Sequence, residues 1–112
     1  MEMTMQFKIQ EMIDKFHRKM EKDEDVRKQV ESVHKTLNID LDSEKYSLVL
    51  NNAKIQDFKE GLLDEADITL ISTPENLTAL INGELRPMKA YVTKKITIKG
   101  KFEDLLYLKK LF

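Results

Sequence analysis

The chain has 112 residues, of which 41% are hydrophobic and 35% are charged, and it contains no cysteine. This length fits a single domain over residues 1–112, and the composition is that of a globular protein rather than a disordered one. Without cysteine, disulfide frameworks, cysteine nucleophiles and thiolate metal sites are excluded, which favours a reducing, cytoplasmic location. No apolar run near the N-terminus reaches the length of a signal or membrane segment, so we expect a soluble, unprocessed protein.

Charge is distributed unevenly along the chain. The net charge is −1, but residues 1–85 carry 11 basic and 18 acidic side chains, whereas residues 86–112 carry 8 basic and 2 acidic ones. A basic C-terminal segment favours contact with anionic membranes or nucleic acid, although lysines also form ordinary solvated faces. No aromatic residue stands in the basic stretch 94–101 to stack on bases, so we expect no nucleic-acid partner.

The N-terminal third predicts two helices. The first has an apolar stripe with spacings of three and four, formed by Ile9, Met12, Ile13, Phe16 and Met20. A polar break at Asp23 separates it from a second apolar stripe, formed by Val26, Val30, Val33 and Leu37.

From Leu37 onward the apolar spacing changes to two, which is typical of half-buried strands. The pattern predicts strands over 37–41 and 46–50 and a weaker one over 55–58, with turns at 42–45 and 51–52. These three strands form an antiparallel meander. A fourth strand, rich in β-branched residues, is predicted over 68–72, after a loop over 61–65.

The C-terminal third alternates short helices with one strand. Thr73 is the expected N-cap of a helix with Pro74 at its first position, and Gly83 ends it. Pro87 begins another short helix, and a fifth strand over 96–98 ends at Gly100. A final helix is expected to bury most of its circumference, because many of its residues are apolar: Phe102, Leu105, Leu106, Leu108, Leu111 and Phe112.

No set of residues in the sequence favours catalysis. His17 and His34 stand among charged neighbours and are expected to be surface histidines on helices. The acidic residues are scattered, and three glycines are too few for a phosphate loop or a nucleophile elbow. We therefore expect no enzyme active site, metal or cofactor. Flexible apolar residues near the helices suit an adaptable binding surface, but they also suit a plain core.

Residues 67–111 resemble the sterol carrier protein family, a family of small lipid-binding domains. The resemblance lies in five consecutive segments, namely 66–70, 77–85, 87–91, 95–100 and 105–111. The first 65 residues agree only in the order of elements. Two departures are that Lys94 stands where members often have glycine, and that the peroxisomal targeting tail of some members is absent after Phe112.

The resemblance implies an α+β fold in which a five-stranded, mainly antiparallel sheet has helices covering one face, with an apolar tunnel between the layers. It implies non-enzymatic binding and carriage of fatty acids, fatty acyl thioesters or isoprenoid and sterol-like lipids. The final helix is the expected lid, so deleting residues 102–112 should abolish lipid binding. Carried over by position, the lipid-binding walls are Leu77, Leu80, Ile81, Met88, Tyr91, Val92, Phe102, Leu105 and Leu106.

Two other functions fit the same pattern. The chain could be an interaction or dimerisation module with a closed core, which would show a large exposed apolar patch. It could also be an accessory domain that presents lipid to an enzyme, which would need an ionisable group at the cavity. The basic C-terminal segment is compatible with transient contact with an anionic membrane, and the sequence leaves that contact, the bound lipid and the oligomeric state open.

Overall fold

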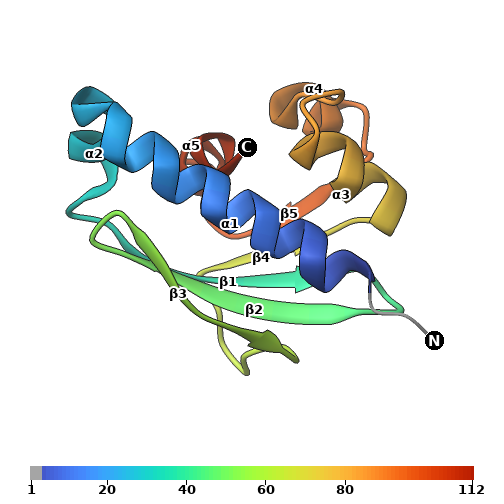
Figure 1. Cartoon of the computed structure of the whole chain (residues 1–112). Helices are drawn as coiled ribbons and strands as arrows, with labels where there is room; N and C mark the ends of the chain where they lie inside the picture. Colours follow the sequence, from blue (N-terminus) through green and yellow to red (C-terminus); the bar gives the residue numbers. More distant parts are fainter. Residues whose placement is uncertain (1–3) are drawn as a thin grey trace.

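The computed structural model describes residues 4–112, so residues 1–3 of the predicted domain lie outside the described residues. The described chain forms one sheet with helices on one of its faces (Figure 1). The helices are α1 (Thr4–Lys22), α2 (Glu24–Val30), α3 (Pro74–Ile81), α4 (Pro87–Val92) and α5 (Asp104–Leu111). The strands are β1 (His34–Asp40), β2 (Lys45–Asn51), β3 (Lys54–Glu60), β4 (Ile68–Ile71) and β5 (Thr97–Lys99).

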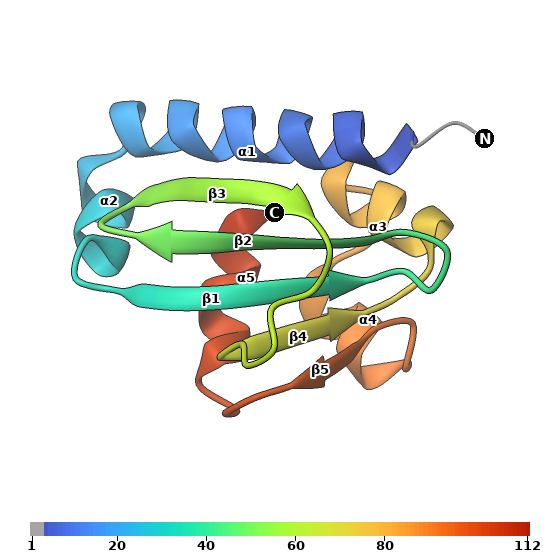
Figure 2. The same cartoon turned by 90° about the horizontal axis from the view of Figure 1, so that it is seen from below.

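The sheet has five strands in the order β3, β2, β1, β4, β5 (Figure 2). The predicted meander is confirmed, because β2 pairs antiparallel with both β1 and β3. β4 pairs parallel with β1, and β5 pairs antiparallel with β4. The sheet is therefore mainly antiparallel with one parallel pair at its centre, and the predicted α+β class is confirmed.

The predicted apolar stripe of α1 is buried. Helix α1 ends and helix α2 begins close to the predicted break at Asp23. The Asp23 side chain accepts a hydrogen bond from the Val26 backbone N–H and caps α2. The prediction that the second helical stripe extends to Val33 and Leu37 is wrong. The helix α2 ends at Val30, because the chain from His34 onward pairs along its full length with β2.

The C-terminal elements begin at the predicted capping residues. The Thr73 hydroxyl accepts from the Asn76 N–H at the start of α3, and Gly83 takes a positive φ of 79° just beyond its end. The final helix buries Asp104, Leu105, Leu108 and Leu111 and half-buries Tyr107 and Lys110, with contacts to α1 and α4. Leu106 is exposed, and Phe102 lies before the helix and is also exposed.

The core lies between the helices and the inner face of the sheet. Strand residues on that face are buried under α1 and α5, among them Leu37, Ile39, Tyr46, Leu48 and Leu70. The other face of the sheet is crossed by the loop over 61–67 (Figure 2). The Asn38 side chain holds that loop, because its Nδ2 donates to the Leu63 carbonyl at 3.0 Å and its Oδ1 accepts from the Leu63 N–H at 2.8 Å.

Candidate functional site

The nine predicted wall residues come from three neighbouring segments on the helix side of the sheet. Leu77, Leu80 and Ile81 lie on α3 and are fully or almost fully buried. Leu105, in the first turn of α5, is buried as well. The structure thus brings four of the predicted residues into one apolar layer against the sheet.

The other five predicted residues are exposed. Three of them lie on the short helix α4, and the remaining two lie just before and within α5. The exposed fractions are largest for Val92, at 72%, and Phe102, at 76%. We call this set the exposed apolar face, and it consists of Met88, Tyr91, Val92, Phe102 and Leu106.

A small hollow lies where the buried and the exposed predicted wall residues meet. It lies between α4, the end of β5 and the start of α5, and it encloses about 30 Å³. Its wall residues are Tyr91, Ile98, Gly100, Lys101, Phe102 and Leu105. Pockets for ligands of drug size usually measure about 300–1,000 Å³. Side chains therefore fill most of the space between α4 and α5 in this state.

Two larger grooves lie on either side of α2. One measures about 370 Å³ and lies between α1, α2 and the β2–β3 turn, with His17, Met20 and Ala53 among its walls. The other measures about 480 Å³ and lies between α1, α2 and α5, where Val26 and Leu106 are its apolar walls. Both grooves are open to solvent and have mixed polar and apolar walls.

Few polar contacts hold α5 to the rest of the molecule. The Lys35 Nζ lies 3.2 Å from Oδ1 of the buried Asp104, which ties the first residue of α5 to β1. The Asp104 Oδ2 accepts from the Lys101 N–H at 3.2 Å. Near the other end of the helix, the Lys110 ammonium donates to the Gln29 side chain on α2. The apolar contacts of Leu105, Leu108 and Leu111 supply the remaining attachment.

His17 departs from its prediction as a surface histidine. It is partly buried in α1, and its Nε2 accepts a hydrogen bond of 3.0 Å from the Ile55 N–H of the edge strand β3. His34 is exposed as expected, but it lies at the start of β1 rather than on a helix. His17 therefore joins a helix to the sheet.

Within residues 4–112, no three His, Asp or Glu side chains converge in a way that would hold a metal ion. The described helices include none with the length and apolar character needed to cross a bilayer.

Sequence and fold comparisons place these features in a family. The profile of the SCP-2 sterol transfer family matches residues 13–112. The chain belongs to the SCP-2 sterol transfer family. This match covers most of the chain, including α2 and the β1–β3 meander, where the sequence carries few distinctive residues.

Solved structures with SCP-2 domains share the fold at low identity. Sterol carrier protein 2 like 2 from Aedes aegypti is 18% identical, with a TM-score of 0.63 over 96% of this chain and 99% of that chain. The palmitated form of the Aedes aegypti protein, solved in solution, is 19% identical with a TM-score of 0.59, covering 90% of each chain. No curated protein matches the sequence.

An enzyme also contains a similar fold. The stereoselective inverting sec-alkylsulfatase Pisa1 from Pseudomonas sp. is 19% identical, with a TM-score of 0.65 over 77% of this chain. The chain spans only 14% of the length of that sulfatase. The SCP-2 fold is thus found both as a nearly whole chain and as a small part of a longer enzyme.

The departure at Lys94 has a structural consequence. Lys94 follows the C-cap of α4 and has a φ of 63°, in the left-handed region that favours glycine. The Lys95 N–H donates to the Ala90 carbonyl at 2.8 Å, which is the bond expected when a left-handed residue ends a helix. A glycine would adopt this backbone conformation without the strain that it imposes on a lysine.

Proposed function

We propose that this chain is a non-enzymatic carrier that binds fatty acids, fatty acyl thioesters or isoprenoid and sterol-like lipids in the cytoplasm. The observation that carries the proposal is the match to the SCP-2 sterol transfer family over residues 13–112. It is supported by the buried apolar residues of α3 and α5 beside an exposed apolar face. The palmitated state of the similar Aedes aegypti protein favours a fatty acyl chain as the ligand.

The proposed binding site lies between α3, α4 and α5. Leu77, Leu80, Ile81 and Leu105 would form its inner wall, and the exposed apolar face would lie at its mouth. The hollow of about 30 Å³ is much smaller than an acyl chain needs, so ligand entry requires α5 to move away from α4. Each methylene group removed from water gains about 0.8 kcal/mol, so a long chain can supply the energy for that movement.

The C-terminal helix α5 is the proposed lid. It follows a short loop after β5, and within residues 4–112 a single ion pair and one side-chain hydrogen bond supply its polar links to β1 and α2. Opening this helix would expose Leu105, Leu108 and Leu111 at the same time. An acyl chain would then replace the contacts that these leucines lose. Because such ligands are poorly soluble in water, the carrier is also proposed to meet an anionic membrane transiently during loading.

A second candidate function is presentation of a lipid-like substrate to an enzyme. The likeness to a small part of a sec-alkylsulfatase favours it, because that protein combines an SCP-2 fold with a much longer chain. In this function the ligand would bind in the same place, but release would require an enzyme. The two functions therefore share the binding site and differ in the partner.

Displacement of a fluorescent fatty acid tests the proposal directly. We expect the purified protein to bind the probe and palmitate to displace it at micromolar concentration, whereas butyrate should displace it poorly because it buries few methylene groups. Equal competition by butyrate and palmitate, or no probe binding, would contradict an apolar acyl-chain site.

A further inference from the structure

Five large apolar side chains are exposed on adjacent segments of the helix layer. Tyr91 and Phe102 line the same small hollow, so the start of α5 and the helix α4 present their apolar side chains side by side. Met88 and Val92 extend this surface along α4, and Leu106 is exposed on α5, where it also lines the groove toward α1 and α2. Soluble domains seldom expose such a group of neighbouring apolar residues without a partner.

Basic residues outnumber acidic ones along the segment that carries the exposed apolar face, although the exposed Glu103 lies next to Phe102. The segment 86–112 has 8 basic residues and 2 acidic ones. One of the two acidic residues, Asp104, is buried and already paired with Lys35. The exposed basic residues nearest in sequence to the apolar ones are Arg86, Lys89, Lys94, Lys95, Lys101 and Lys109.

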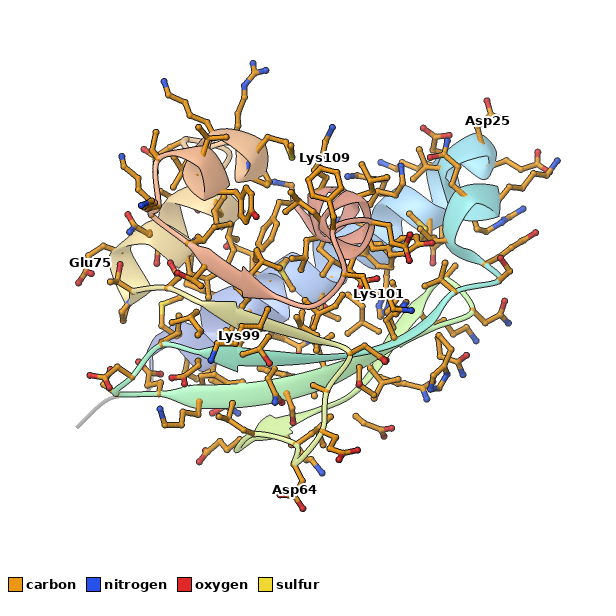
Figure 3. The ribbon with its side chains drawn as sticks, turned by 180° about the vertical axis from the view of Figure 1, so that it is seen from behind. Asp25, Asp64, Glu75, Lys99, Lys101 and Lys109 are labelled. Carbon is orange, nitrogen blue, oxygen red and sulfur yellow. The ribbon has the colours of Figure 1, made fainter. Side chains whose placement is uncertain are left out.

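The opposite side of the molecule is acidic. Residues 56–67, which include the end of β3 and the loop across the open sheet face, contain five acidic residues and one lysine. Figure 3 shows Lys109 on the helix side of the molecule and Asp64 beyond the sheet on the other side. An anionic surface would therefore attract the α4–α5 part of the helix layer and repel the loop side, which orients the molecule.

We propose that the exposed apolar face docks on the surface of an anionic bilayer, with its apolar side chains entering the lipid and the lysines of the same segment contacting the headgroups. This inference rests on the proposed function, since a carrier must approach the membrane from which it takes lipid. An apolar surface in a lysine-rich segment suits a bilayer, which accepts aromatic and aliphatic groups at the interface and attracts each lysine. Docking in this orientation places the mouth of the proposed binding site against the membrane.

The first test uses tryptophan as a reporter, because the chain has none of its own. Phe102→Trp is the reporter, and Phe7→Trp is the matched control, since Phe7 on α1 is exposed to a similar extent, 79% against 76%. With vesicles of phosphatidylcholine and phosphatidylserine, the Phe102→Trp emission should shift to shorter wavelength and that of Phe7→Trp should not. A shift for Phe7→Trp alone would overturn the proposal and assign docking to α1.

The second test removes the apolar contacts. Val92→Ser with Phe102→Ser should lower binding to these vesicles at least about tenfold, because both side chains would otherwise leave water. Phe7→Ser should leave binding unchanged. Equal binding by all three proteins would overturn the proposal. A concentration-dependent dimer that forms through Val92 and Phe102, without vesicle binding, would also overturn it.

The third test removes charge. Lys89→Gln, Lys95→Gln and Lys109→Gln together should lower binding to the anionic vesicles at least about tenfold, and added salt should weaken binding by the unchanged protein. The control changes the same number of lysines on α2 and β3, at Lys28, Lys54 and Lys59, and should have little effect. Equal binding to phosphatidylcholine vesicles would contradict the role of charge.

Measurement of fatty-acid binding without vesicles separates this inference from the proposed function. The Lys89, Lys95 and Lys109 variant should still bind the fluorescent fatty acid, because none of these residues lies in the proposed site. Fatty-acid binding without any vesicle binding would overturn the docking face alone. Vesicle binding without any fatty-acid binding would overturn the carrier function alone.

Discussion

Lys35, on β1, places its Nζ 3.2 Å from Oδ1 of Asp104, the first residue of α5. The Asp104 side chain is 1% exposed and that of Lys35 is 23% exposed, so a largely buried carboxylate depends on a lysine that reaches it from the sheet. The carboxylate of Asp104 raises the pKa of Lys35 above its ordinary value. This pair joins the proposed lid to the sheet.

Removing Lys35 alone should lower the free energy of unfolding more than removing both Lys35 and Asp104. Lys35→Met leaves Asp104 buried without a counter-charge, so the free energy of unfolding should fall by about 1–3 kcal/mol, less than for a fully buried pair because Lys35 is partly exposed. Lys35→Met with Asp104→Asn should recover part of that loss. Urea denaturation of the single and double variants measures the coupling, and additive effects would show that the pair does not interact.

Asp67 makes stability depend on pH in the acid range. Its Oδ2 accepts from the Thr36 N–H at 2.9 Å and from the Thr36 hydroxyl at 3.1 Å, and these bonds lower the pKa of the carboxyl group. A lowered pKa in the folded state stabilises the protein above the pKa of the unfolded chain, about 3.9, and this contribution is lost as pH falls through the folded-state value.

Asp67→Asn should therefore lower the Tm at neutral pH and flatten its fall between about pH 5 and pH 3. The control is Asp64→Asn, a neighbouring exposed carboxylate in the same loop. Thermal unfolding of the three proteins across this range is the measurement. A pH dependence of Tm in Asp67→Asn as steep as in the unchanged protein would refute the assignment.

Lys94→Gly should stabilise the protein. Lys94 has a φ of 63°, which costs a non-glycine residue about 1 kcal/mol or more, so glycine should raise the free energy of unfolding by about 0.5–1 kcal/mol. Lys95→Gly removes the same charge from the next position, where φ is not positive, and should not stabilise. The measurement is the urea midpoint of each of the two variants. Equal changes in the two midpoints would exclude a backbone cause.

Tethering α5 should block ligand entry. The Lys110 and Gln29 side chains meet in a hydrogen bond between α5 and α2, and the chain has no cysteine that would interfere with labelling. Cysteines introduced by Gln29→Cys and Lys110→Cys, joined by a short bis-maleimide, should slow uptake of a fluorescent fatty acid strongly. The same variant without the linker is the control. Uptake at the same rate in both would mean that α5 is not the lid.

The order of elements could be predicted from sequence because local signals mark each boundary. Asp23 and Thr73 cap helices with their own side chains, and the period-two pattern after Leu37 marks the meander. Which apolar residues of α5 stay exposed could not be predicted, because apolar content does not reveal how many sides of a helix have a neighbour. Leu105 is buried and Leu106 is exposed, although they are adjacent leucines.

Long-range polar contacts were not predictable from local pattern. His17 accepts a hydrogen bond from the Ile55 N–H, and Lys35 pairs with Asp104. The partners lie far apart along the chain, so no periodic pattern in the sequence predicts these contacts. A charged residue, Asp104, next to the apolar run of the last helix was the one available signal for a buried pair. For the same reason the sequence could group the nine predicted wall residues but could not separate the four buried ones from the five exposed ones.

Mass spectrometry of organic extracts from the purified protein tests the central claim most directly. The account predicts lipids with long acyl or isoprenoid chains that co-purify in near-stoichiometric amounts and that palmitate displaces. An extract without lipid, together with a protein that takes up no added palmitate, would contradict the carrier function and favour an interaction module with a closed core.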